Sequence, residues 1–71
     1  MSGDTIANRL KSLRVEHDMS QRELAEYMEV SNSTISRIEK GAMPDVETLI
    51  KYAENFGVST DWILFGKEYG E

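Results

Sequence analysis

Residues 20–41 read SQRELAEYMEVSNSTISRIEKG, a stretch that holds two short helical patterns with a break between them. Ser20 and Glu23 have the spacing of a capping box, in which each side chain bonds the backbone amide of the other residue. A helix is therefore expected over about residues 21–28. Ser31 is placed to cap a second helix over about residues 32–40, and Gly41 is placed to end it. The stretch predicts two helices of similar length joined by a turn of about three residues.

This layout is a helix-turn-helix over about residues 20–41, and its apolar positions suit two crossed helices. The side chains expected to face inward are Leu24, Ala25, Met28, Val30, Ile35 and Ile38. Ala25 is small enough for the two helices to approach closely, and Val30 brings the turn into the core. Because Ile35 and Ile38 face inward, the opposite side of the second helix is left to solvent.

The solvent side of the second helix carries side chains suited to reading the edges of base pairs. It presents Asn32, Ser33, Ser36, Arg37 and, one turn further on, Lys40. An asparagine amide can pair with adenine and an arginine guanidinium with guanine, while short serines let a helix lie deep in the major groove. A helix selected only for stability favours Glu, Lys and Ala, whereas Asn, Ser and Thr are indifferent helix formers. The residues alone leave two interpretations open, a DNA-reading helix and an ordinary solvated face.

The rest of the chain also has helical spacing and no period-two segment that predicts a strand. A first helix is expected over about residues 5–17, with Asp4 as its N-cap. A fourth is expected over about residues 46–56, with Leu49, Ile50, Ala53 and Phe56 facing the core, and a short fifth follows the cap Ser59. The sequence therefore predicts an all-α fold, a single domain over residues 1–71 with its last two helices at about 46–66 and a frayed tail at 67–71.

Composition limits the functions that this chain can have. Its 71 residues include no cysteine and one histidine, so a disulfide framework or a metal cage is not expected. His17 has no partners for a catalytic triad, and we expect no enzyme activity, no metal and no cofactor. No apolar run reaches the length of a membrane span. We expect a soluble cytoplasmic protein that makes no membrane contact.

Charge is distributed unevenly along the sequence. The net charge is −5, and residues 42–71 hold two basic and six acidic residues, a local net charge of −4. An acidic chain is unsuited to coating nucleic acid indiscriminately, although one face of it can still contact DNA.

The segments MSQRELA (residues 19–25) and VSNSTISRIEKG (residues 30–41) together resemble the helix-turn-helix of the Cro/phage-repressor family, also called the XRE type. The segment LIKYAENFGVSTDWILFG (residues 49–66) resembles the later helices of that family, so the resemblance covers about residues 6–66. It implies a compact five-helix, lambda-repressor-like DNA-binding domain. It also implies a bacterial or phage-encoded transcriptional regulator, expected to be a repressor that binds double-stranded DNA as a homodimer and is nucleoid-associated when bound.

The resemblance assigns roles to individual positions. Asn32, Ser33 and Arg37 match the family's usual base-reading places, and Ser36 matches a less constant one. Places that commonly contact phosphates are matched by Gln21, Ser31 and Lys40. Arg14 and Glu39 match a pair that joins the first helix to the end of the third, and this arginine is also expected to approach a phosphate.

Two departures from the family pattern weaken the expected hold on DNA. The first turn position, often a glycine with positive φ, is Glu29, for which a left-handed conformation costs about 1–2 kcal/mol. The loop after Gly41 has Ala42 and Met43 where relatives often carry cations. With few phosphate contacts per subunit, a dimer on a palindrome with half-sites about 34 Å apart would double the contacts.

Apolar side chains near the chain end are candidates for the dimer interface. Trp62 and Ile63 are expected to face mainly inward, whereas Leu64 and Phe65 are expected to be partly available, so the predicted interface is Leu64, Phe65 and Trp62. These side chains can equally close the domain's own core. One functional alternative also remains, a protein-interaction module such as an antitoxin or an anti-repressor target, in which DNA binding is secondary.

Overall fold

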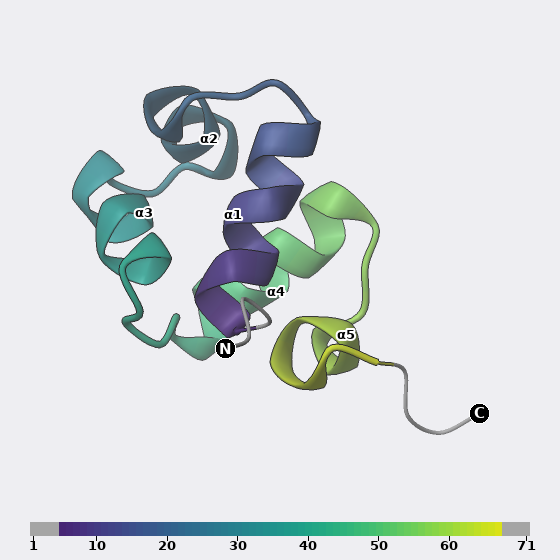
Figure 1. Ribbon diagram of the computed structural model, residues 1–71. Coiled ribbons are helices and arrows are strands. Elements are labelled where there is room, and N and C mark those ends of the chain that lie inside the picture. Colours follow the sequence, from purple (N-terminus) through teal and green to yellow (C-terminus); the bar gives the residue numbers. More distant parts are fainter. Residues whose placement is uncertain (1–4, 68–71) are drawn as a thin grey trace.

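The structure, a computed structural model, describes residues 5–67, and these form five helices and no strand. The helices are α1 (Ile6–Glu16), α2 (Gln21–Met28), α3 (Asn32–Glu39), α4 (Val46–Phe56) and α5 (Thr60–Phe65). In Figure 1, α2 and α3 lie on one side of α1 and α5 on the other, with α4 behind α1. The predicted all-α five-helix fold is confirmed. The predicted cap Asp4 and most of the predicted tail, residues 68–71, lie outside the described residues.

Every one of these five helices begins at a side-chain oxygen that accepts a hydrogen bond from the backbone amide three residues later. The capping box is complete, with Ser20 Oγ 3.0 Å from the Glu23 amide and the Ser20 amide donating to Glu23 Oε1 at 2.8 Å. The expectation for α1 was wrong by one residue, because Thr5 rather than Asp4 is the N-cap and accepts from the Asn8 amide at 3.1 Å. These caps fix where each helix starts.

The core lies where the five helices converge. Its buried apolar residues are Leu10, Leu13, Leu24, Ala25, Met28, Ile35, Ile38, Tyr52 and Ile63. The prediction for α4 was wrong at one position, since Ile50 is 44% exposed and Tyr52 is fully buried instead. The inward face of α4 is set by Leu49, Tyr52, Ala53 and Phe56, which follow the i, i+3, i+4, i+7 spacing, and Ile50 falls outside it.

Tyr52 is an unusual core residue because it brings a polar atom inside. Its hydroxyl is buried and makes no hydrogen bond within the described part of the chain. Burial, and after it the nearby Glu39 carboxylate, raises the pKa of Tyr52, so the hydroxyl stays protonated. The ring stacks on Phe56 with centroids 6.2 Å apart, and the His17 and Phe56 rings lie in a T-shaped arrangement with centroids 4.8 Å apart.

A buried arginine joins the first helix to the last. Arg9 Nε donates to the carbonyl oxygen of Ile63 at 2.9 Å, and its Nη2 donates to that of Leu64 at 3.1 Å. Both carbonyls belong to the last turn of α5, where the free carbonyls of a helix favour a cation. Arg9 therefore caps a helix of only six residues and holds it against α1. No helix within residues 5–67 combines the length and the apolarity that a bilayer crossing requires.

The turn between α2 and α3 contains a strained residue. Glu29 has φ 60° and ψ 43°, the left-handed conformation, and its amide donates to the carbonyls of Ala25 and Glu26. The amide of Val30 also donates to the Ala25 carbonyl, at 2.9 Å. A side chain thus occupies a position where glycine is the usual residue, and the turn keeps its geometry at some cost in stability.

We predict that Glu29→Gly raises the free energy of unfolding by roughly 0.5–1 kcal/mol. The substitution relieves about 1–2 kcal/mol of left-handed strain, part of which is offset by the greater freedom of glycine in the unfolded chain. Urea unfolding measures the change. The matched control is Glu26→Gly, which lies inside α2 and should lower the free energy of unfolding by about 1 kcal/mol. Equal signs for the two variants would contradict the strain argument.

Candidate nucleic-acid interface

The outer side of α3 is a polar surface held in place from below. Ile35 and Ile38 are 0% and 3% exposed, so they fix which side of the helix faces outward. On that outward side Asn32, Ser33, Arg37 and Lys40 are exposed and Ser36 is half-buried. Among the described residues, nothing forms a hydrogen bond or ion pair with the side chains of Asn32 and Arg37. The two longest candidate base-reading groups are therefore available to an external partner.

The start of α3 is ordered by a cluster of hydroxyl groups. Ser31 Oγ accepts from the Thr34 amide at 3.1 Å and lies 2.7 Å from Thr34 Oγ1 and 3.2 Å from Ser33 Oγ. Ser31 is thus the N-cap, as its position in the sequence predicts. Because its hydroxyl is used in this way, the part of Ser31 left for an anion at the helix N-terminus is mainly its backbone amide.

A bidentate ion pair ties α1 to the end of α3. Arg14 Nε lies 2.7 Å from Glu39 Oε2, and Nη2 lies 3.0 Å from Oε1. The two side chains are only 12% and 3% exposed. The hydrogen bonds to Glu39 raise the pKa of Arg14 above its ordinary value, so the guanidinium remains charged. The pair that the family resemblance implies is therefore formed, in a partly desolvated position where the geometry of the charges is fixed.

The same pair also holds the beginning of α2. Arg14 Nη1 donates to the carbonyl of Met19 at 2.7 Å, just before α2, and Gln21 Nε2 donates to Glu39 Oε1 at 3.1 Å. Two of the candidate phosphate contacts, Arg14 and Gln21, are thus brought together by Glu39. Arg14 has little exposed surface left, whereas Gln21 at the first position of α2 is half-buried.

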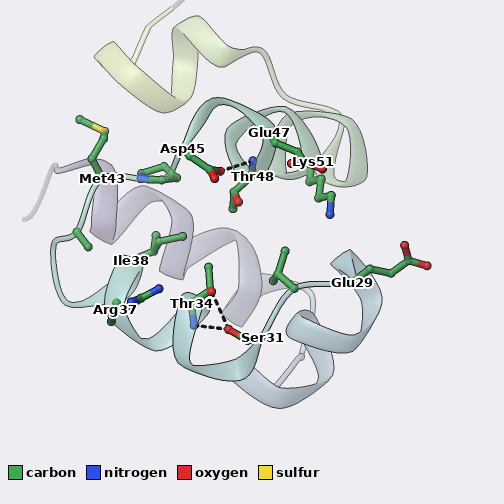
Figure 2. A pocket seen from close by; sticks show the side chains of 13 residues that line it. Glu29, Ser31, Thr34, Arg37, Ile38, Met43, Asp45, Glu47, Thr48 and Lys51 are labelled. Carbon is green, nitrogen blue, oxygen red and sulfur yellow. Dashed lines mark hydrogen bonds between the residues drawn. The ribbon is translucent and has the colours of Figure 1, made fainter.

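A groove of about 680 Å³ runs between α3 and α4, beside the candidate base-reading side chains. Figure 2 shows Ser31, Thr34 and Arg37 on its α3 side and Asp45, Thr48 and Lys51 on its α4 side. Its ionisable lining consists of Glu29, Asp45, Glu47, Arg37 and Lys51. Asp45 is committed to capping α4, since its carboxylate accepts from the Thr48 amide at 2.9 Å, and bonding to Thr48 lowers the pKa of Asp45.

This groove brings Lys51 to the same side of the molecule as Arg37, and sequence reasoning did not identify it. The signal was present in the helical spacing, because Thr48 and Tyr52 face inward and Lys51 falls beside them at the edge of the buried face. The groove is not strongly basic, since three carboxylates and two cations line it. On the α4 side Lys51 is balanced by Glu47, and the cation on the α3 side is Arg37.

The three residues predicted to form a dimer interface are placed differently from one another. Trp62 and Leu64 are half-buried, Phe65 is 56% exposed and Ile63 between them is fully buried. Trp62 also packs against the core cluster. The surface that α5 offers to a partner therefore centres on Phe65.

No group of three or more His, Asp or Glu side chains suited to a metal ion occurs within residues 5–67. His17 is the C-cap of α1, and its Nδ1 lies 2.8 Å from the Leu13 carbonyl oxygen. Its ring nitrogen thus meets the carbonyl end of a helix, the place that favours a positive charge.

Taken together, a capped second helix, a tight turn and a third helix with a free polar face define a helix-turn-helix protein. Residues 10–63 match the family described as helix-turn-helix, and the chain belongs to this family. The resemblance to the Cro/phage-repressor, or XRE, type is confirmed. Family membership also supports the expectation that the chain is not an enzyme.

Among the relatives, the HTH-type transcriptional regulator ImmR of Bacillus subtilis is 35% identical over 65 residues, which are 90% of this chain and 50% of ImmR. The SPbeta prophage-derived uncharacterized HTH-type transcriptional regulator YonR of the same species is 37% identical over 62 residues, 86% of this chain and 57% of YonR. The uncharacterized HTH-type transcriptional regulator MJ0272 of Methanocaldococcus jannaschii is 40% identical over 60 residues, 83% of this chain and 91% of MJ0272. The chain thus spans about half of the first two relatives and nearly all of the third.

We predict that Glu39→Ala lowers the free energy of unfolding by about 3 kcal/mol, because it leaves the buried Arg14 charge without its partner. Replacing both residues, with Arg14→Met and Glu39→Leu, should cost less than Glu39→Ala alone, since no buried charge is left over. Urea unfolding of the three proteins measures the difference. A change below about 0.5 kcal/mol for Glu39→Ala would place the pair among ordinary surface ion pairs.

Proposed function

We propose that this protein is a sequence-specific DNA-binding transcriptional regulator, a repressor that binds a palindromic operator as a homodimer with α3 in the major groove. One observation carries the proposal. The outer face of α3 presents an amide and a guanidinium that bond to no other group within residues 5–67, while Ile35, Ile38 and Glu39 fix the helix from the opposite side. Rigid presentation of such groups is what direct readout of base edges needs.

In this proposal Asn32, Ser33, Ser36 and Arg37 contact base edges. Arg37 pairs with guanine through O6 and N7, and Asn32 pairs with adenine, each contact discriminating by roughly 1–3 kcal/mol. Ser36 is half-buried and reaches less far from the helix than Arg37. Most of the sequence preference is therefore assigned to Asn32 and Arg37.

The phosphate contacts are assigned to Gln21, Ser31, Lys40 and Arg14. Lys40 contributes an exposed ammonium group. Gln21 and Ser31 contribute their backbone amides at the starts of α2 and α3. The side chain of Gln21 is already bonded to Glu39, and that of Ser31 to Thr34. Arg14 acts mainly through position, because its guanidinium donates to Glu39 and Met19. With so few cations, a monomer binds DNA weakly, and its affinity depends only slightly on salt concentration. A dimer on DNA doubles the contacts and compensates for this weakness.

The names of the relatives support the regulatory role, since ImmR, YonR and MJ0272 are each named HTH-type transcriptional regulators. A bacterial or phage setting, and a location on the nucleoid when bound, belong to the same proposal.

One observation favours a second function, a protein-interaction module. Glu29, Asp45 and Glu47 line the groove beside α3, and their charges oppose a phosphate backbone while suiting a basic peptide. A chain that selects no DNA sequence but retains a protein partner would fit this alternative.

We predict that selection from a random DNA pool at moderate salt recovers an inverted repeat. With that repeat, Arg37→Ala should lower affinity by roughly 30-fold or more, because the dimer loses one bidentate base contact in each half-site, and relax preference at one base step in each half-site. Affinity is measured by fluorescence anisotropy on the selected site and on single-base variants of it.

The matched control is Lys11→Ala, which removes one exposed positive charge from α1, outside the helix-turn-helix. It should change affinity little and leave sequence preference intact. Equal losses for Arg37→Ala on all sequences would assign Arg37 to the phosphate backbone and contradict base reading by α3.

A further inference from the structure

The outer face of α4 carries apolar side chains that the domain's own core does not use. Val46 is 72% exposed and Ile50 is 44% exposed, and Met43 just before the helix is 67% exposed. Val46 and Ile50 are four residues apart, so they lie one above the other on adjacent turns. Three of the six large apolar side chains that are exposed within residues 5–67 are thus gathered at the beginning of one helix.

Two opposite charges run beside this apolar row. Glu47 and Lys51 are also four residues apart and form the neighbouring row on α4. Figure 2 shows both side chains extending from adjacent turns of α4. Within the part of the chain that the structure describes, no ion pair or side-chain hydrogen bond engages either of them. We call these four residues, Val46, Glu47, Ile50 and Lys51, the outer α4 face.

We propose that the outer α4 face binds the same face of a second copy, with the two α4 helices antiparallel about a twofold axis that passes near residues 48–49. This inference rests on the proposed function and names the interface of its dimer. In an isologous contact, residue i meets residue j of the second copy and j meets i. Val46 then packs on Ile50 of the second copy, and Glu47 lies beside Lys51 of the second copy, each contact occurring twice.

Charge complementarity is the reason for choosing a second copy as the occupant. In a parallel arrangement the twofold axis would run along the helices and place the two charged rows at opposite edges of the contact, so no glutamate would meet a lysine of the second copy. In the antiparallel arrangement each Glu47 faces Lys51 of the second copy, and each Val46 faces Ile50. No other residue is needed to match the two faces. The outer α4 face therefore carries its own matching surface.

The size of this face indicates how strong the dimer is. Four side chains on two turns of helix are far fewer than the 20–30 residues per side of a standard stable interface. The dimer is therefore weak in solution and is completed when both copies bind one DNA molecule, where their effective concentration is high. Because a twofold axis relates whole subunits, the same axis would relate the two α3 helices on that DNA.

The experiment uses two single variants of the full chain, E47K and K51E, analysed alone and as an equimolar mixture. In a homodimer of E47K all four facing charges are positive, and in one of K51E all four are negative. In the mixed dimer every facing pair is again a lysine with a glutamate. Sedimentation equilibrium at low salt and without DNA measures association, with concentrations extended into the millimolar range.

We predict that each variant alone associates at least tenfold more weakly than the parent chain, and that the mixture regains the parent affinity or exceeds it. The matched control is a mixture of E26K and K11E, two exposed positions on α2 and α1. Since the net charge is −5, each mixture combines chains of −3 (−5 + 2) and −7 (−5 − 2). The control mixture should associate no better than the parent, which separates local pairing from attraction between whole molecules.

Three results would overturn the proposal. The first is that both variants associate like the parent, and the second is that the control mixture gains as much as the test mixture. The third is that Phe65→Glu abolishes association while E47K and K51E leave it unchanged, which assigns the interface to α5. Thermal unfolding of each variant shows whether it is folded. Association is measured without DNA, so failure of this proposal leaves the DNA-selection result, and with it the proposed function, to be judged separately.

Discussion

The Arg14–Glu39 ion pair is the contact on which the arrangement of the helix-turn-helix depends. Its two short hydrogen bonds join α1 to the last residue of α3, and further bonds from Arg14 to Met19 and from Gln21 to Glu39 add the entry to α2. Three helices thus share one desolvated charge cluster. The hydrophobic effect that buries an apolar core is non-directional, whereas a bidentate ion pair has one good geometry. The pair therefore fixes the end of α3 relative to α1 and α2, while Ile35 and Ile38 fix which side of α3 faces outward.

This division of roles explains why the outer side of α3 can consist of poor helix formers. Asn32, Ser33 and Ser36 add little helix stability, and Ser31 compensates at the N-terminus by capping and by contacting two neighbouring hydroxyl groups. Stability is supplied by the inward side and by the ends of the helix. The outward side is left for binding. The strained Glu29 in the preceding turn lowers the free energy of unfolding, and the packing of the helices compensates for this loss.

The sequence predicted most of the fold because most of its signals are local. Capping residues lie within three positions of the amides they bind, so the starts of α2, α3, α4 and α5 follow from the sequence alone. The inward side of α4 was only partly predicted, because Ile50 is apolar and Tyr52 carries a hydroxyl, while helical phase places Tyr52 inside and Ile50 outside. Arg9 was missed for a different reason. Its partners are carbonyl groups 54 and 55 residues away in the sequence, and no local sequence pattern predicts a contact of that kind.

The distribution of charge links the fold to the way in which this protein would hold DNA. With a net charge of −5 and a mixed-charge groove beside α3, a single subunit has few phosphate contacts to offer. In the proposed dimer, affinity for DNA would come from base contacts and from the pairing of subunits, both of which depend on geometry more than on total charge. The weak contact proposed for the outer α4 face would suit a regulator of this kind, because the subunits would dimerise mainly on DNA that carries two correctly spaced half-sites. In the proposed complex, Val46 and Ile50 would read the spacing of two half-sites, and Asn32 and Arg37 would read the bases within each.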